Sequence, residues 1–233
     1  MTYRSLDSRQ ILQTLDRLTQ RIDERFPSAG LSAVSRELVA LGRFCAAEAD
    51  TLGKPNWPIR TTAGALILAV VALSIMLLAR PWADGTPLAF DNVGDYLQAI
   101  EAAVNELVFL AVAIWFLGSI ERRLKRHRAL AAIHQLRSIA HVVDMHQLTK
   151  DPDQLLSEQP GTSSSPTRTM TRAMLGRYLD YCSELLSLTS KIAALFVQQL
   201  DDPVVLAAVD EVSSLTNGLS QKIWQKLTIL ERN

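Results

Sequence analysis

Residues 61–79 read TTAGALILAVVALSIMLLA, a stretch that contains no charged side chain. A helix rises about 1.5 Å per residue, so about 20 apolar residues cross the roughly 30 Å hydrocarbon core of a bilayer. The stretch begins too far from the N-terminus to be the apolar region of a cleaved signal peptide. It therefore predicts a transmembrane helix.

A second apolar stretch, LVFLAVAIWFLGSI at residues 107–120, predicts a second span. Residues 81–106 between the two stretches hold acidic side chains and no Lys or Arg, whereas basic residues are densest directly after residue 120. Lys and Arg near span ends stay preferentially on the cytoplasmic side of a membrane. We therefore expect both termini in the cytoplasm, an acidic connector on the opposite side, and a location of the bacterial inner-membrane type.

The remaining sequence predicts amphipathic helices, because apolar residues recur every three or four positions. Each such helix buries only one face, so the helices are expected to cover one another in a bundle. The predicted apolar stripes are Ile11, Leu15, Leu18, Ile22 and Phe26; Leu31, Val34, Leu38, Leu41 and Cys45; Leu175, Leu179, Cys182, Leu185, Leu188, Ile192 and Phe196; and Val205, Val209, Val212, Leu219, Ile223 and Leu227.

These patterns predict an all-α protein, a two-span transmembrane helical hairpin with a cytoplasmic bundle of about five amphipathic helices. No Gly or Pro interrupts residues 121–148, so the second span is expected to continue into the cytoplasm as one helix. The expected divisions are an N-terminal helical hairpin at 1–55, the transmembrane hairpin at 56–121 with spans at about 59–80 and 98–120 and an outer loop at 81–97, a cytoplasmic extension of the second span at 122–150, a flexible linker at 151–168, and a C-terminal helical hairpin at 169–233.

Asn105 and Glu106 are polar residues close to the start of the second apolar stretch. An ionisable group within a membrane is costly unless it faces a partner, water or the interface. Asn105 and Glu106 are therefore candidates for lining a pore or pairing helices, with Trp115 or Phe116 as a candidate constriction. The alternative is a short second span, with Glu106 reaching the outer headgroups.

The basic residues after the second span are candidates for contact with anionic lipid headgroups, although they also serve as an ordinary topology signal. They are Arg122, Arg123, Lys125, Arg126 and Arg128. The segment therefore identifies membrane lipids as expected partners.

Histidines recur every seven residues at His127, His134 and His141, which places them on one helix face. Such a row is a candidate pH sensor, or simply a solvated polar stripe. A metal would need ligands three or four residues apart, and only His141 and Asp144 have that spacing. We therefore predict no metal site, and keep His134, His141 and Asp144 as a distant alternative for a metal-assisted enzyme or sensor.

No catalytic or nucleotide-binding motif is present, and the formal net charge of zero does not suggest a nucleic-acid partner. Cys45 and Cys182 fall at apolar positions of predicted helices, which favours reduced, buried thiols over a disulfide. We predict no enzymatic activity and no cofactor.

The leading functional hypothesis is a non-enzymatic membrane protein whose cytoplasmic bundle mediates protein–protein interaction or self-association. The alternative is a homo-oligomeric, cation-preferring channel gated by the bundle, because the outer entrance would be acidic.

Overall fold

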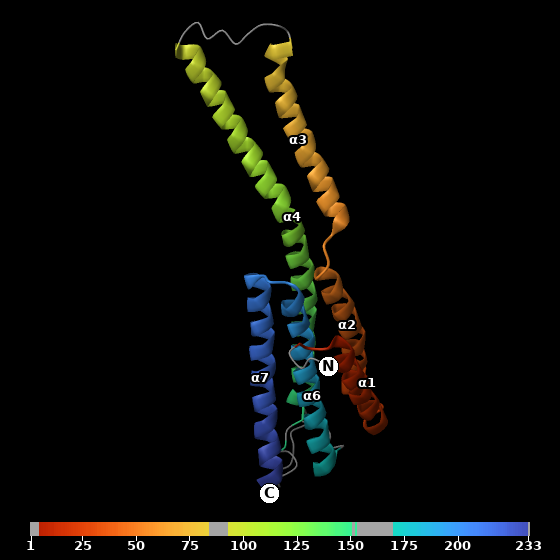
Figure 1. The fold of residues 1–233 in the computed structure, drawn as a ribbon. Helices are drawn as coiled ribbons and strands as arrows, with labels where there is room; N and C mark the ends of the chain where they lie inside the picture. Colours follow the sequence, from red (N-terminus) through yellow and green to blue (C-terminus); the bar gives the residue numbers. More distant parts are fainter. Residues whose placement is uncertain (1–4, 84–92, 151, 153–169, 233) are drawn as a thin grey trace. The chain divides into compact units, whose positions relative to one another are not determined.

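The computed structural model describes residues 5–83, 93–150, 152 and 170–232, and every regular element in these ranges is a helix (Figure 1). The all-α prediction is confirmed. The helices are α1 (Ser8–Arg25), α2 (Gly30–Leu52), α3 (Trp57–Ala83), α4 (Val93–Leu148), α6 (Arg172–Gln199) and α7 (Pro203–Arg232).

The chain forms two compact units, which are described separately. The bundle unit comprises residues 1–53 and 126–233, and the hairpin unit comprises residues 54–125. Helix α4 contributes its first part to the hairpin unit and its last part to the bundle unit.

A side-chain cap and a proline-containing turn account for where the first helices of the bundle unit begin and end. The carboxylate of Asp7 accepts a hydrogen bond from the backbone N–H of Arg9, which caps the start of α1. Residues 26–29, which include Pro27, separate α1 from α2. Every residue of the predicted apolar stripes is buried or partly buried, so the 3.6-residue pattern identified the inward faces correctly.

Helix α6 has the central position in the bundle unit, since it packs against α1, α2 and α7. Near the turn between α1 and α2, the ring of Phe26 meets the edges of Tyr178 and Tyr181 on α6 at centroid distances of 5.4 and 6.2 Å. The last part of α4 adds a narrow buried stripe to the same core: Ala129, Ala132, Ile133, Leu136, Ala140 and Val143. The predicted all-helical bundle is thus confirmed.

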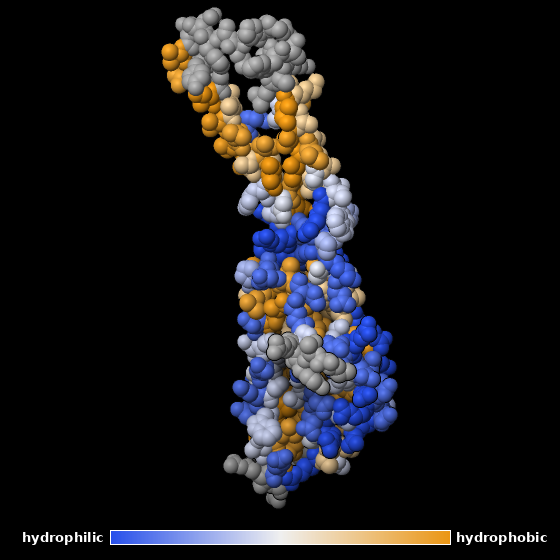
Figure 2. Space-filling model, in the orientation of Figure 1, coloured by the Kyte–Doolittle hydropathy of each residue, from blue (hydrophilic) through white to orange (hydrophobic). Residues whose placement is uncertain are grey.

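The hairpin unit differs from the bundle unit in its surface. Both α3 and α4 contain a segment long and apolar enough to cross a membrane, and none of either segment is buried. Figure 2 shows apolar side chains covering α3 and the first part of α4. Large exposed side chains include Leu68, Leu73, Leu107, Val108 and Phe109. The apolar faces of these two helices are therefore not packed against other described elements of the chain.

The helices of the hairpin unit extend past the predicted spans. Helix α3 ends at Ala83 and α4 begins at Val93, while the predicted spans of about 59–80 and 98–120 stay predictions. Helix α4 is continuous to Leu148, as the absence of helix breakers after residue 120 predicts. Most of the predicted acidic connector and nearly all of the predicted linker lie outside the described residues.

Candidate functional site

Helices α3 and α4 meet along a seam of half-buried residues spaced three or four apart on each helix. This is the spacing of one helix face, so the less exposed residues form one stripe on each helix. The hairpin seam consists of Ala63, Gly64, Ile67, Val70, Val71 and Ser74 on α3, and of Leu110, Ala113, Leu117, Ile120 and Glu121 on α4.

Glu106 extends this seam by one turn, since it lies four residues before Leu110. Its Oε1 atom accepts a hydrogen bond of 2.5 Å from the hydroxyl of Ser74. A carboxylate among exposed apolar side chains thus accepts a hydrogen bond from α3, the other helix of the hairpin unit, and its helix-pairing role stays a prediction.

The other residues of the predicted pore are not brought to this contact. Asn105 is exposed beside it, and Trp115 and Phe116 are exposed on later turns of α4. Within one chain, the structure therefore joins only Glu106 of this set to α3. Sequence reasoning missed Ser74 as its partner, although Ser74 lies in the same three- and four-residue register as Gly64, Ile67 and Val71.

A second carboxylate, Glu121, ties the other end of the seam together. It binds Arg60 Nε at 2.8 Å and Lys125 Nζ at 3.0 Å, and it accepts a hydrogen bond of 3.1 Å from the backbone N–H of Asn56. Lys125 also donates to the carbonyl oxygen of Lys54 at 2.8 Å. The hydrogen bond from Arg60, followed by the bonds from Asn56 and Lys125, outweighs partial burial and lowers the pKa of Glu121 to about 2. The segment leading into α3 is thereby tied to α4 by a fully ionised carboxylate.

Two further basic side chains after the second apolar stretch are bound by carboxylates of the bundle unit. Arg126 lies 2.7 Å from Asp202, whose side chain is only 1% exposed, and Arg128 lies 2.6 Å from Glu48. Burial alone would raise the pKa of Asp202. The hydrogen bonds from Arg126 and from the N–H groups of Val205 and Val204 outweigh it, so this pKa lies below its ordinary value.

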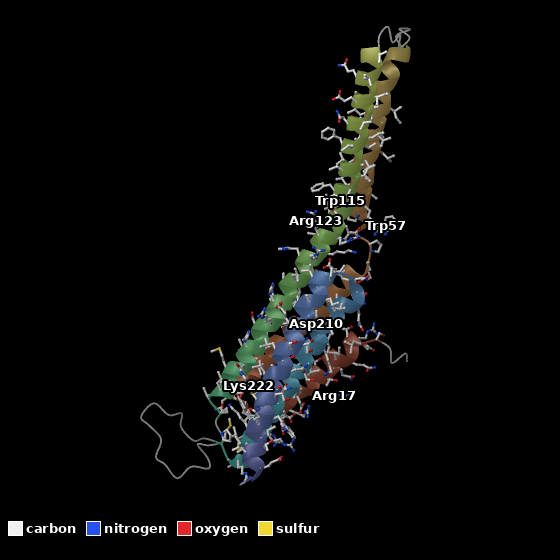
Figure 3. The ribbon with its side chains drawn as sticks, turned by 90° about the vertical axis from the view of Figure 1, so that its left-hand side faces the viewer. Arg17, Trp57, Trp115, Arg123, Asp210 and Lys222 are labelled. Atoms are coloured by element: carbon white, nitrogen blue, oxygen red, sulfur yellow. The ribbon has the colours of Figure 1, made fainter. Side chains whose placement is uncertain are left out.

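Three of the five predicted headgroup-contact residues, Lys125, Arg126 and Arg128, are therefore engaged inside the chain. Arg122 and Arg123 remain exposed, and no described carboxylate lies within ion-pair distance of either. The guanidinium of Arg123 lies over the ring of Phe116, 5.9 Å from its centroid. Figure 3 shows Arg123, Trp115 and Trp57 toward the same end of the hairpin unit.

The histidine row is exposed at His127, His134 and His141, and its role as a pH sensor stays a prediction. Among the described residues, no group of three or more His, Cys, Asp or Glu side chains could hold a metal ion. Asp144, the one residue at ligand spacing from His141, accepts a hydrogen bond of 2.6 Å from Gln147 Nε2.

The histidine that packs closely is a different one. The ring of His146 lies directly against Gly30, the first residue of α2, where even an added Cβ would collide with Cε1 of the ring. The absence of a side chain at Gly30 permits this close approach of the His146 ring.

Cys45 and Cys182 are both free and buried. Burial is the main cause that raises the pKa of each thiol to about 12, with Glu48 adding to the effect at Cys45. Because the thiolate is the reactive form, both side chains are chemically quiet at neutral pH.

A groove of about 550 Å³ runs along the surface of the bundle unit between α1, α6 and α7. Its wall includes Ser183, Ser187, Lys191, Trp224 and Leu227. Trp224 is the largest exposed apolar side chain of the bundle unit, with 68% of its surface accessible. The sequence pattern had not singled it out, because Trp224 does not belong to the buried stripe of α7.

The chain matches no protein-family model, no curated protein and no solved structure.

Proposed function

We propose that this chain is an integral membrane protein in which the hairpin unit is the anchor and the bundle unit binds protein. The anchor is supported by the unburied apolar surfaces of α3 and α4, which in water would expose far more contiguous apolar area than soluble proteins tolerate. Under this proposal the bundle lies on the cytoplasmic side of a bacterial-type inner membrane, as the basic residues after the second span favour. The proposal assigns no reaction to the chain.

The observation that carries the binding function is Trp224 beside the groove between α1, α6 and α7. Tryptophan is the residue type most often found at the energetic centre of protein interfaces, because a large apolar ring fits a pocket on the partner. The groove presents serine hydroxyls, Lys191 and apolar side chains beside the indole, which is a mixed surface of the kind found at such interfaces.

Site-specific photo-crosslinking in cells tests this proposal. A photoreactive phenylalanine at position 224 should give one defined adduct, whose mass identifies either a second copy or another protein. The matched control carries the same group at Met145, which is exposed to a similar degree, at 67%, but does not line the groove. Absence of an adduct at position 224, or equal adducts at both positions, would contradict the proposal.

A homo-oligomeric, cation-preferring channel remains the alternative. The contact between Glu106 and Ser74 makes it less favoured, since this carboxylate is used within the hairpin seam. Conductance of the purified protein in bilayers, measured for the natural chain and for Glu106→Gln, separates the two functions. A cation selectivity that Glu106→Gln abolishes would make the channel the better description.

A further inference from the structure

At the end of the hairpin seam where Glu121 lies, the positive charge exceeds what the single carboxylate of Glu121 can neutralise. Residues 54–60 and 121–125 include Lys54, Arg60, Arg122, Arg123 and Lys125, but only one acidic residue, Glu121. Arg60 and Lys125 share the Glu121 carboxylate. Arg122 and Arg123 are therefore the adjacent arginines left without a described carboxylate partner, directly after the second apolar stretch.

The geometry of Arg123 suits it to bind an anion. The central carbon of its guanidinium lies over the ring of Phe116, 5.9 Å from the ring centroid, which is a cation–π contact. The N–H donors of a guanidinium project from its edge and match the oxygens of a phosphate. Arg122 directly precedes Arg123 on the same exposed turn of α4, so a second guanidinium lies close along the chain.

Exposed indoles lie toward the same end of the hairpin unit (Figure 3). Trp57 at the start of α3 is 68% exposed, and Trp115, two turns before Arg123 on α4, is 67% exposed. Tryptophan favours the headgroup level of a bilayer, where an apolar ring and a polar N–H are both accommodated. Indoles near unpaired arginines thus combine the chemistry of the lipid interface with that of a phosphate site.

We propose that Arg122 and Arg123 bind the phosphate of an anionic lipid headgroup in the leaflet at this end of the hairpin unit. The inference rests on the proposed insertion of α3 and α4 in a membrane. It narrows the expected headgroup contacts from five basic residues to two, because Lys125, Arg126 and Arg128 are held by carboxylates of the chain. Inorganic phosphate shares the same chemistry and is the competing source of the anion.

Quenching of tryptophan fluorescence by brominated lipids tests the proposal on the full chain. A background with Trp82→Phe and Trp224→Phe leaves Trp57 and Trp115 as reporters. The protein is placed in vesicles of brominated phosphatidylglycerol, brominated phosphatidylcholine or their mixtures, and the relative binding constant of the two lipids is measured. Arg122→Gln with Arg123→Gln is compared with the matched pair Arg9→Gln and Arg17→Gln, which removes two exposed arginines of α1.

We expect at least about a fivefold preference for phosphatidylglycerol in the background protein, falling to twofold or less in the Arg122 and Arg123 variant and unchanged in the α1 variant. An equal preference in all three proteins, or none in the background protein, would overturn the proposal. So would loss of the preference when phosphate replaces chloride at constant ionic strength, because the site would then take free phosphate. If neither brominated lipid quenches the reporters, the hairpin is not in the bilayer and the proposed function fails instead.

Discussion

The hydroxyl of Ser74 on α3 donates a hydrogen bond of 2.5 Å to Glu106 on α4. Arg60 and Glu121 join the same helices again, at 2.8 Å. Arg60 lies fourteen residues before Ser74 on α3, and Glu121 lies fifteen residues after Glu106 on α4. The two polar contacts are separated by nearly the same number of residues on each helix, so they fix the antiparallel register. The other seam residues are apolar or small, and one can replace another with little loss of stability.

Ser74→Ala should destabilise the hairpin unit, because it leaves the Glu106 carboxylate without its donor. Hydrogen bonds between membrane helices contribute about 1 kcal/mol, and we expect a loss of this size. The measurement is the free energy of unfolding in mixed micelles titrated with sodium dodecyl sulfate. Ser119→Ala is the control, since that hydroxyl bonds to the carbonyl of Phe116 on its own helix.

Removing one partner of a hydrogen bond that is shielded from water costs more stability than removing both, which gives this prediction a second part. Ser74→Ala combined with Glu106→Leu removes donor and acceptor together, so it should cost less than Ser74→Ala alone. A double variant that is less stable than the single one would show that Glu106 has another essential contact.

Gly30→Ala should destabilise the bundle unit by about 0.5–1.5 kcal/mol, because the half-buried side chain of His146 must leave its present position to admit the extra carbon. The added methyl would collide with the ring of His146. Thermal unfolding followed by circular dichroism measures the effect. Gly176→Ala is the control, because a Cβ there meets nothing within 4 Å and alanine should stabilise this helical position by about 0.5–1 kcal/mol.

Gly30→Ala should be partly rescued by His146→Ala, which opens the space that the methyl needs. If Gly30→Ala were as harmless as Gly176→Ala, the close packing of α2 on α4 would be contradicted.

Asp202 should make the bundle unit less stable in acid. Its pKa is lowered in the folded state, so its stabilisation is complete above the unfolded-state value of about 3.9 and is lost as the pH falls through the folded-state pKa. Asp202→Asn should lower the free energy of unfolding at pH 7 by about 1–2 kcal/mol, since Arg126 is partly exposed and solvent replaces some of the interaction.

Urea unfolding at several pH values checks this expectation. The curve for Asp202→Asn should be flatter than the natural curve below about pH 4. Asp210→Asn, at an exposed position on α7, should leave the curve unchanged. A natural protein with no additional loss of stability in acid would contradict the assigned role of Asp202.

Cys45 and Cys182 should react very slowly with maleimide in the folded protein. With each pKa near 12, only about one thiol in 10⁵ is ionised at pH 7, and burial limits access further. The measurement is the labelling rate by mass spectrometry, before and after addition of denaturant. Two thiols should react after unfolding in the absence of reductant, and fewer than two would indicate a disulfide.

The features that sequence could predict are those encoded by local periodicity. Stripes such as Leu175 to Phe196 identified the inward faces, and the run of apolar residues at 61–79 identified α3 as a candidate span. The features that it missed depend on which distant residues meet. Lys226 on α7 donates to the carbonyl of Gln147 at the end of α4, and nothing in the spacing of either helix predicts that pair.

The basic segment after residue 120 shows the same limit. Its five positive charges are visible in the sequence, but their partners Glu48 and Asp202 lie on α2 and directly before α7. Only the tertiary arrangement separates arginines held inside the chain from those available to a ligand.

The register set by Ser74 with Glu106 and by Arg60 with Glu121 has a consequence for the history of this gene. Residues at the exposed positions of the two helices can drift freely among apolar types. The number of residues from 60 to 74 and from 106 to 121 cannot, because a one-residue insertion or deletion in either segment would rotate one contact off the seam by about 100°. Lineages that keep both contacts should therefore show substitutions in these two segments but no change in their length.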